Sequence, residues 1–146
     1  DKAYDSTDYS DFITRFYASG AVTTVRSYTM TLIDDQLCNN AGVVEVYVWK
    51  PNSGMFSSVV EEFKASREFF EKHGWEVELW QENIGGRDNL QFVMCSKSTE
   101  DQAKSFASLN SDKEWLLEQP NAPLWDSSSD NSKFIGSFQL EPIIVD

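Results

Sequence analysis

The chain has 146 residues, with 12 Lys and Arg against 24 Asp and Glu, and therefore a net charge of −12. This length predicts one domain, and a composition of 40% hydrophobic and 25% charged residues is typical of a globular chain rather than a disordered one. The negative charge argues against binding to nucleic acid or an anionic membrane, since both favour clustered Lys and Arg. His73 is the single histidine, which excludes multi-histidine metal sites, and we expect no metal and no cofactor.

Two cysteines, Cys38 and Cys95, are too few for a disulfide framework, so we expect both to be free, buried thiols. Cys95 lies in an apolar run typical of a central strand, where an inert thiol is favoured over a nucleophile. No signal peptide is recognised before the domain and no apolar run is long enough to span a bilayer. We therefore expect a cytoplasmic protein.

Hydrophobic periodicity predicts four strands and two helices after residue 42. Apolar residues from Phe56 to Phe70 recur at helical spacing, with Asn52-Ser53-Gly54 expected at the helix start and Gly74 at its C-terminal end. Capping patterns at 99–102 and 111–114 indicate a second helix that breaks near Asn110. The expected strands are 43–50, 75–83, 89–97 and 133–141, and the expected helices are 54–73 and 99–118. On the second strand Glu76, Glu78 and Glu82 share one face and are expected to meet solvent.

The order βαββαβ predicts an α+β, ferredoxin-like domain with an antiparallel sheet and two helices on one face. The other face is left uncovered, although the valines of strand 43–50 alternate with Glu45, Tyr47 and Trp49, so neither face suits water. We therefore expect a homodimer through the open sheet face. Residues 1–41 folding over that face would be the alternative.

The same residues resemble a known superfamily. The element order, the Phe-rich first helix ending in His73-Gly74-Trp75, and the segment 106–111 before Glu114-Trp115 resemble the dimeric α+β-barrel superfamily, with its antibiotic-monooxygenase-like, EthD-like and NIPSNAP-like domains. The resemblance covers residues 42 to about 144 and lies in pattern, not in an active-site signature. It implies pairing into a dimeric α+β barrel. Because the superfamily includes cofactor-free oxygenases, isomerases, haem enzymes and domains without known chemistry, it informs fold more than function.

The N-terminal extension, residues 1–41, precedes the domain at 42–146. Residues 2–13 resemble residues 104–116, and residues 26–30 resemble residues 135–140, so the extension is interpreted as the last helix and strand of a truncated preceding repeat. A chance match between amphipathic segments is the alternative. The repeat interpretation predicts a helix at 8–17 and a strand within 22–34 that pairs with a sheet edge.

Arg67 interrupts the apolar stripe of the first helix. An unpaired buried charge is costly, so Arg67 is expected to pair with Glu45 or to reach the helix edge. The functional alternative makes Arg67 the anchor for an anionic group on an otherwise apolar ligand, bound between the sheet and this helix. The candidate ligand-binding residues are Arg67, Phe63, Glu45, Tyr47, Trp49 and Phe92.

These residues predict a small-molecule-binding protein for a hydrophobic or amphipathic ligand, including an anionic one. A cofactor-free monooxygenase or isomerase-type enzyme is an alternative, with Glu45, Arg67, Tyr47 and His73 as its polar candidates. For His73 itself, interaction with the helix end and general-base catalysis are both open. A structural dimerisation domain without a ligand is the third hypothesis.

Overall fold

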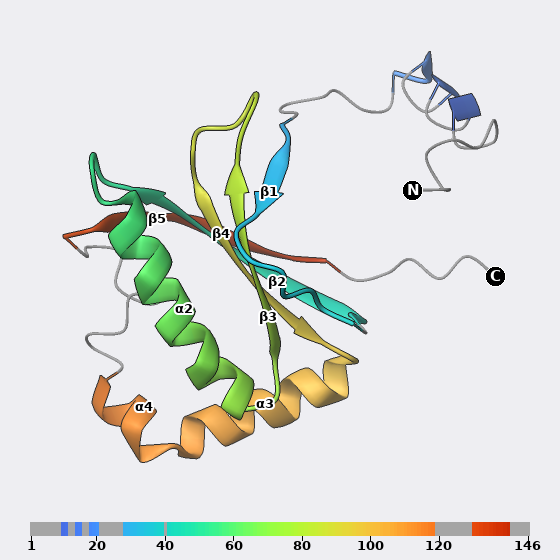
Figure 1. Cartoon of the computed structure of the whole chain (residues 1–146). Helices are drawn as coiled ribbons and strands as arrows, with labels where there is room; N and C mark the ends of the chain where they lie inside the picture. The colour runs from blue at the N-terminus through green and yellow to red at the C-terminus, as the bar shows by residue number, and fades with distance from the viewer. Residues whose placement is uncertain are drawn as a thin grey trace.

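The computed structural model describes residues 10–11, 14–15, 18–20, 28–39, 41–118 and 130–140. In these ranges the chain is an α+β structure with a five-stranded antiparallel sheet and three helices (Figure 1). In chain order the elements are β1 Met30–Leu32, β2 Val43–Pro51, α2 Phe56–Lys72, β3 Glu76–Glu82, β4 Leu90–Ser96, α3 Thr99–Ser111, α4 Lys113–Glu118 and β5 Ser132–Leu140.

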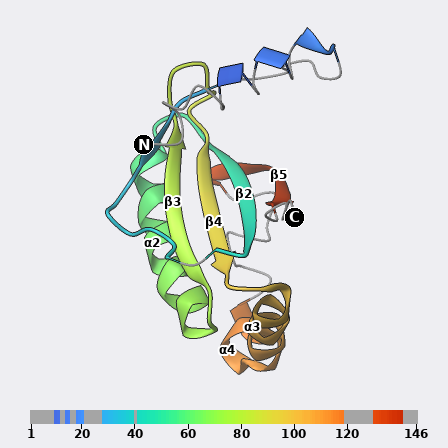
Figure 2. The same ribbon diagram turned by 90° about the vertical axis from the view of Figure 1, so that its right-hand side faces the viewer.

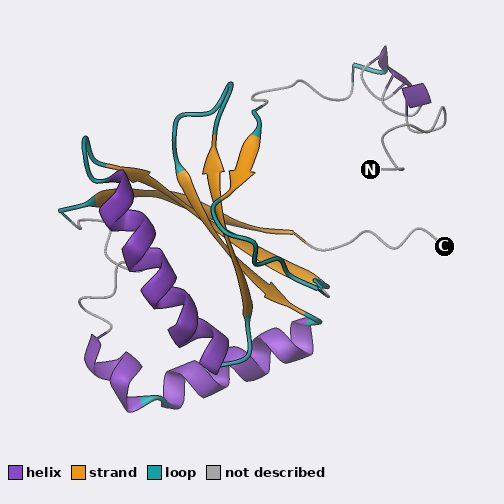
Figure 3. Ribbon diagram, viewed as in Figure 1, coloured by secondary structure: helices purple, strands orange, loops and turns teal. Residues whose placement is uncertain are grey.

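The strands lie in the order β1-β3-β4-β2-β5, and every neighbouring pair is antiparallel (Figure 3). Helix α2 connects β2 to β3, which are separated in the sheet by β4. Helices α3 and α4 connect β4 to β5, which are separated by β2. These two split connections are compatible with the expected ferredoxin-like fold, to which β1 adds a fifth strand.

The main core lies between α2 and one face of the sheet. Phe63 of α2 is 1% exposed, and its ring contacts those of Trp49 on β2 and Phe92 on β4 at centroid distances of 5.3 and 5.5 Å. The register pairs Tyr47 with Phe92 and Trp49 with Leu90, so these side chains share the face that α2 covers. Glu45 follows the same alternation and lies on this face too.

The predicted helices and strands are confirmed with small shifts in their bounds. Helix α2 begins after Met55, which supplies no side-chain cap, so the expected cap from Asn52-Ser53-Gly54 is wrong. The predicted second helix is divided at Asp112, two residues after the expected break. Asp112 accepts the backbone N–H of Glu114 at 2.8 Å and so caps the short helix that follows.

The opposite face of the sheet carries a second apolar cluster and is partly covered by the chain itself. Val46, Val48, Val93 and Cys95 form the cluster. Residues 33–39, here called the crossing segment, lead from β1 toward β2. They first pass the outer edge of β3, where Asp34 and Gln36 contact α2, and they reach this face at its end, with α2 behind the sheet in Figure 2. The part of residues 1–41 that the structure describes therefore covers some of the face that was expected to be open.

Three contacts fasten the end of the crossing segment to the sheet, and they correct two expectations. Cys38 forms a disulfide with Cys95, so the expectation of free thiols is wrong. The backbone N–H groups of Cys38 and Asn39 donate to the carboxylates of Glu78 and Glu76 at 2.6 and 2.5 Å. These carboxylates are half-buried, and Glu82 is 1% exposed, so the prediction that this face of β3 meets solvent is also wrong.

The strand expected within residues 22–34 is confirmed as β1, which pairs with the edge strand β3 through Met30 and Glu82, Thr31 and Gln81, and Leu32 and Trp80. Residues 22–27 lie outside the described residues. Of the helix expected at 8–17, residues 10–11 and 14–15 are described and are helical, and the rest lies outside the described residues. The preceding repeat itself stays a prediction.

None of the helices within the described ranges combines the length and the apolar character that crossing a membrane requires.

Candidate functional site

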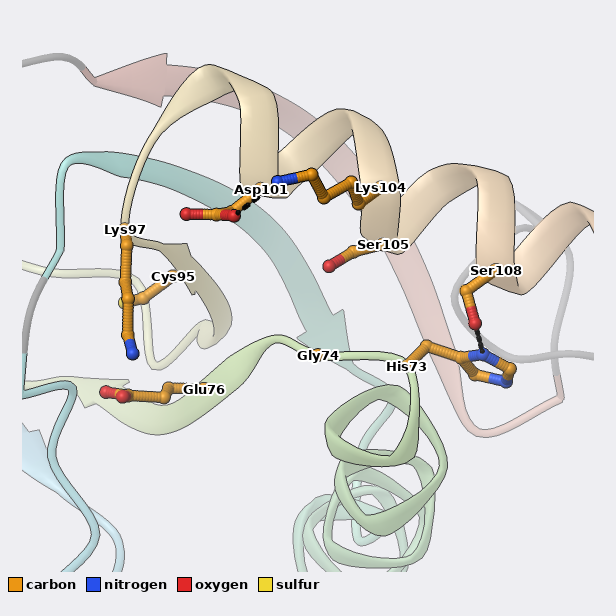
Figure 4. A pocket seen from close by; sticks show the side chains of 9 residues that line it. All are labelled: His73, Gly74, Glu76, Cys95, Lys97, Asp101, Lys104, Ser105 and Ser108. Carbon is orange, nitrogen blue, oxygen red and sulfur yellow. Dashed lines mark hydrogen bonds and ion pairs between the residues drawn. The ribbon is translucent and has the colours of Figure 1, made fainter.

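A polar pocket of about 540 Å³ lies where the turn after α2, the end of β4 and helix α3 meet (Figure 4). Its walls come from three separate stretches of the chain, so it exists only in the folded protein. The lining residues are His73, Gly74, Glu76, Cys95, Lys97, Asp101, Lys104, Ser105 and Ser108.

The turn after α2 sets the floor of the pocket. His73 is the C-cap residue of α2. Gly74 follows with a φ of +104°, a backbone conformation that residues with a Cβ rarely adopt. A Cβ at Gly74 would also lie 3.0 Å from Oγ of Ser105, which is itself buried. Glycine at this position therefore allows α3 to approach the turn closely.

His73 is buried and contacts both α3 and Asp112, the residue that follows α3. Its Nδ1 lies within hydrogen-bond distance of Oγ of Ser108, at 2.9 Å. Its Nε2 is 3.1 Å from Oδ2 of Asp112, although the two groups are not aligned for a hydrogen bond. The ring also packs edge-on against Phe69, with centroids 5.1 Å apart. The side chain thus joins α2 to the α3–α4 junction instead of returning to the carbonyls of its own helix.

A carboxylate with a lowered pKa lies beside this histidine. Lys72 donates to Asp112 at 2.8 Å, and together with backbone N–H groups from Glu114 and Trp115 it lowers the pKa of Asp112 to about 2. The same contact raises the pKa of Lys72. Asp112 is therefore ionised at neutral pH.

The rim of the pocket carries charges of both signs. Lys104 pairs with Glu100 at 2.9 Å and with Asp101 at 3.3 Å, and these contacts raise its pKa. Ser98 and Lys104 lower the pKa of Asp101. On the opposite rim Lys97 points toward Glu76 (Figure 4). Such a rim can contact both an anionic and a cationic group of one ligand.

The residues predicted from sequence to line a ligand site instead form core and edge contacts. Trp49, Phe63 and Phe92 are buried, and the rings of Trp49 and Phe92 each pack against that of Phe63. Arg67 pairs with Asp34 of the crossing segment at 2.5 Å, so the expected pairing with Glu45 is wrong. Asp34 lies 33 residues before Arg67, in the N-terminal extension, so its position beside this helix depends on the fold.

Glu45 has a different partner from the one expected. It accepts a hydrogen bond from the hydroxyl of Tyr47 at 3.3 Å, and burial, followed by this carboxylate, raises the pKa of Tyr47 well above its usual range. Tyr47 is therefore a neutral hydrogen-bond donor at physiological pH.

A second pocket, of about 310 Å³, does lie between α2 and the edge of the sheet. Its apolar walls come from Leu32, Ile33, Phe56 and Val60, and Glu61 and Gln81 are among its polar residues. The predicted location between helix and sheet thus holds a pocket, but at the N-terminal half of α2 and with none of the six predicted residues.

The polar pocket was not predicted. Asp101, Ser105 and Ser108 follow helical spacing and lie on one face of α3, but a polar stripe on a helix is ordinarily interpreted as a solvated surface. Only His73 among the lining residues was a candidate from sequence.

In comparisons with known proteins, no protein-family model and no curated protein matches this chain.

Proposed function

We propose that this chain is a small-molecule-binding domain whose ligand occupies the polar pocket beside α3. The observation that carries the proposal is the pocket itself, about 540 Å³ in volume, with a buried histidine in its floor and fixed charges on its rim. Ligand sites are concave and orient their ligands through a few well-placed polar groups, and this pocket supplies such groups.

The charges favour an amphipathic ligand with an acidic group over a purely hydrophobic one. Lys97 reaches the pocket from the end of β4, while the amine of Lys104 is already paired with two carboxylates. Lys97 is therefore the cation best placed to meet a ligand's carboxylate or phosphate, and Glu76 opposite it suits a ligand amine. The exposed Ser108 and the buried His73 add hydrogen-bonding groups at one end of the pocket.

The test is a titration followed by ¹H–¹⁵N correlation spectra, with short-chain carboxylates, amino acids, inorganic phosphate and uncharged alcohols as probes. We expect a charged probe to shift the amide signals of Gly74 and Ser108, and Lys97→Gln to weaken its binding by about tenfold. Lys64→Gln, on the outer surface of α2 in an exposed pair with Glu61, is the matched control and should leave binding unchanged. Charged probes that shift no pocket signal at millimolar concentration would refute the proposal.

The smaller pocket keeps the proposal of a hydrophobic ligand testable. Leu32, Ile33, Phe56 and Val60 provide apolar walls for an alkyl chain. If this pocket binds the ligand, decanoate should shift the amides of Ile33 and Phe56, and Ser57→Trp at its margin should abolish those shifts. Shifts confined to Gly74 and Ser108 would assign decanoate to the polar pocket instead.

An enzymatic role is the alternative that the contact between Ser108 and His73 favours, because a histidine within 2.9 Å of a hydroxyl can act as its base. The backbone N–H groups of α3 are used within the helix, so they offer no oxyanion donors beside Ser108. Covalent labelling of Ser108 by a fluorophosphonate, absent in Ser108→Ala and retained in Ser111→Ala, would favour this alternative. The polar residues suggested for a monooxygenase or isomerase do not form one site. Arg67 pairs with Asp34, Glu45 with Tyr47, and His73 with Ser108.

We propose self-association through the part of the sheet face that the crossing segment leaves exposed. The register places Phe138 beside Val46 and Leu140 beside Val44, and these two β5 side chains are 46% and 55% exposed. An exposed apolar row next to a buried cluster is typical of an interface. Sedimentation at micromolar concentration should show a dimer that Phe138→Glu dissociates and Leu116→Glu, on α4, does not; a monomer throughout would contradict this.

The disulfide also bears on the compartment. Disulfides persist in oxidising compartments and are rare in the cytosol. The bond between Cys38 and Cys95 therefore favours an exported chain over the cytoplasmic location expected from the sequence. Thiol alkylation and mass spectrometry of the protein from its native source would distinguish the two, since a cytosolic chain would carry two alkylated thiols.

A further inference from the structure

We propose that the reduced chain has a metal site, in which Cys38, Cys95 and Glu78 bind a zinc ion that the disulfide excludes. The ligand atoms of these three side chains already lie within 4.8 Å of one another. Two thiolates and one carboxylate suit Zn²⁺, which takes sulfur and oxygen ligands in tetrahedral geometry. Cys95 also borders the proposed ligand pocket, but Cys38 and Glu78 are not among the residues that line that pocket.

The positions of the cysteines fit a shared ion. Their Cα atoms are 6.3 Å apart, and two thiolates on one zinc ion stand about 3.8 Å from each other. Rotation of the two side chains after reduction is enough to reach that separation. Glu78 lies directly opposite Val93, and Cys95 lies directly opposite Glu76 on the adjacent strand. Glu78 and Cys95 are therefore diagonal neighbours on the same face of the sheet.

The carboxylate is held in place by groups that are not ligands. One oxygen of Glu78 accepts the backbone N–H of Cys38 at 2.6 Å, and the other accepts Nε1–H of Trp80 at 2.7 Å. Each oxygen retains a lone pair for an ion. Metal ligands are commonly oriented by hydrogen bonds of this kind, which fix the carboxylate before the metal arrives.

The crossing segment has other attachments that keep Cys38 close after the disulfide is broken. Asp34 pairs with Arg67, Gln36 donates to Glu71, and the N–H of Asn39 donates to Glu76. Cys95 itself is 4% exposed in β4 and has no freedom to leave. Because Cys38 and Glu78 are only half-buried, a water molecule can reach the fourth position of the ion.

The chemistry balances in two steps. A dithiol reductant gives two electrons and two protons to the disulfide and becomes a disulfide itself, leaving Cys38 and Cys95 as thiols. Zn²⁺ then displaces both thiol protons and binds the two thiolates and the carboxylate of Glu78, so two protons are released to solvent. The affinity should therefore fall as the pH is lowered.

The test uses the full chain, with Zn²⁺ alone as the probe and a phosphine as reductant. Competition with a chromogenic chelator should show one zinc ion per reduced chain and at least a hundredfold weaker binding to the oxidised chain. Cys38→Ser should abolish binding, and Glu78→Gln should weaken it at least about tenfold. Glu76→Gln is the matched control, because Glu76 is on the same strand face, also accepts an N–H from the crossing segment, and is not one of the three ligands.

Three results would overturn the proposal. The first is equal binding by the oxidised and reduced chains. The second is an equal loss in Glu76→Gln and Glu78→Gln, which would remove Glu78 as a specific ligand. The third is unchanged zinc binding in urea, because zinc would then be bound by the two thiols of an unfolded chain and not by a folded site. Circular dichroism of the reduced chain without metal separates this last case, and a thiolate-to-metal charge-transfer band with Co²⁺ would support both cysteines as ligands.

Discussion

Reduction of the disulfide should destabilise the fold by about 4 kcal/mol. Cys38 and Cys95 are 57 residues apart, and the loss of chain entropy on closing a loop of that length corresponds to about 4 kcal/mol at room temperature. A single domain has only about 5 to 15 kcal/mol of stability in total, so the effect is a large part of it. Residual structure in the reduced, unfolded chain lowers the figure, which makes it an upper value.

The assay is urea unfolding followed by the fluorescence of the five tryptophans, on oxidised and phosphine-reduced protein, both with a chelator so that no metal stabilises the reduced form. Thermal unfolding of the same two samples should show a Tm about 12 °C lower for the reduced protein. The double variant Cys38→Ser/Cys95→Ser should behave as the reduced protein and should not respond to the phosphine. A difference below about 1 kcal/mol between the two redox states would refute the reasoning, because the bond would then not restrict the unfolded chain.

Three further predictions concern packing and charge. Gly42→Ala should cost at least about 2 kcal/mol in urea unfolding, because its Cβ would lie 2.1 Å from the carbonyl oxygen of Lys97; an unchanged midpoint would contradict this. Phe63→Ala should cost about 3 to 5 kcal/mol and Leu116→Ala, at 55% exposure, less than about 1, so equal losses would argue against the core assignment. The carboxyl of Asp112 titrates near 3.8 in the unfolded chain and near 2 when folded, so its stabilisation is present above about pH 4 and lost as the pH falls toward 2. The stability difference between wild type and Asp112→Asn, which keeps the cap, should therefore shrink over that range in urea titrations, and a constant difference would contradict the shift.

The elements that were predicted correctly are those that local patterns determine. The spacing of Val59, Val60, Phe63 and Phe70 defines α2 without knowledge of its neighbours. The strand β4, apolar except for Gln91 and Ser96, is the central strand of the sheet. The course of residues 33–39 depends instead on contacts with α2 and β3, far away in sequence. For this reason the partner of Arg67, the burial of the β3 carboxylates and the disulfide were all beyond a local analysis.

The candidate site shows the same division. Aromatic residues at inward positions are used equally by a packed core and by an apolar cavity, and in this chain Trp49, Phe63 and Phe92 belong to the core. The polar pocket joins a helix end, a strand end and one face of α3, none of which has a sequence signature. His73 was found because it is unique in the chain, and its contact with Ser108 required the fold.

The two edges of the sheet differ in how much unpaired strand they offer to another chain. On one side the outer edge of β3 is already used, by β1 and by the N–H of Ile33, which donates to the carbonyl of Leu79. On the other side no described residue pairs with the outer edge of β5. The sheet therefore ends in two unequal edge strands, because β1 has three residues and β5 has nine. A strand added to β5 would form a longer ladder than a strand added to β1, and a very short edge strand is one way in which proteins limit edge-to-edge aggregation.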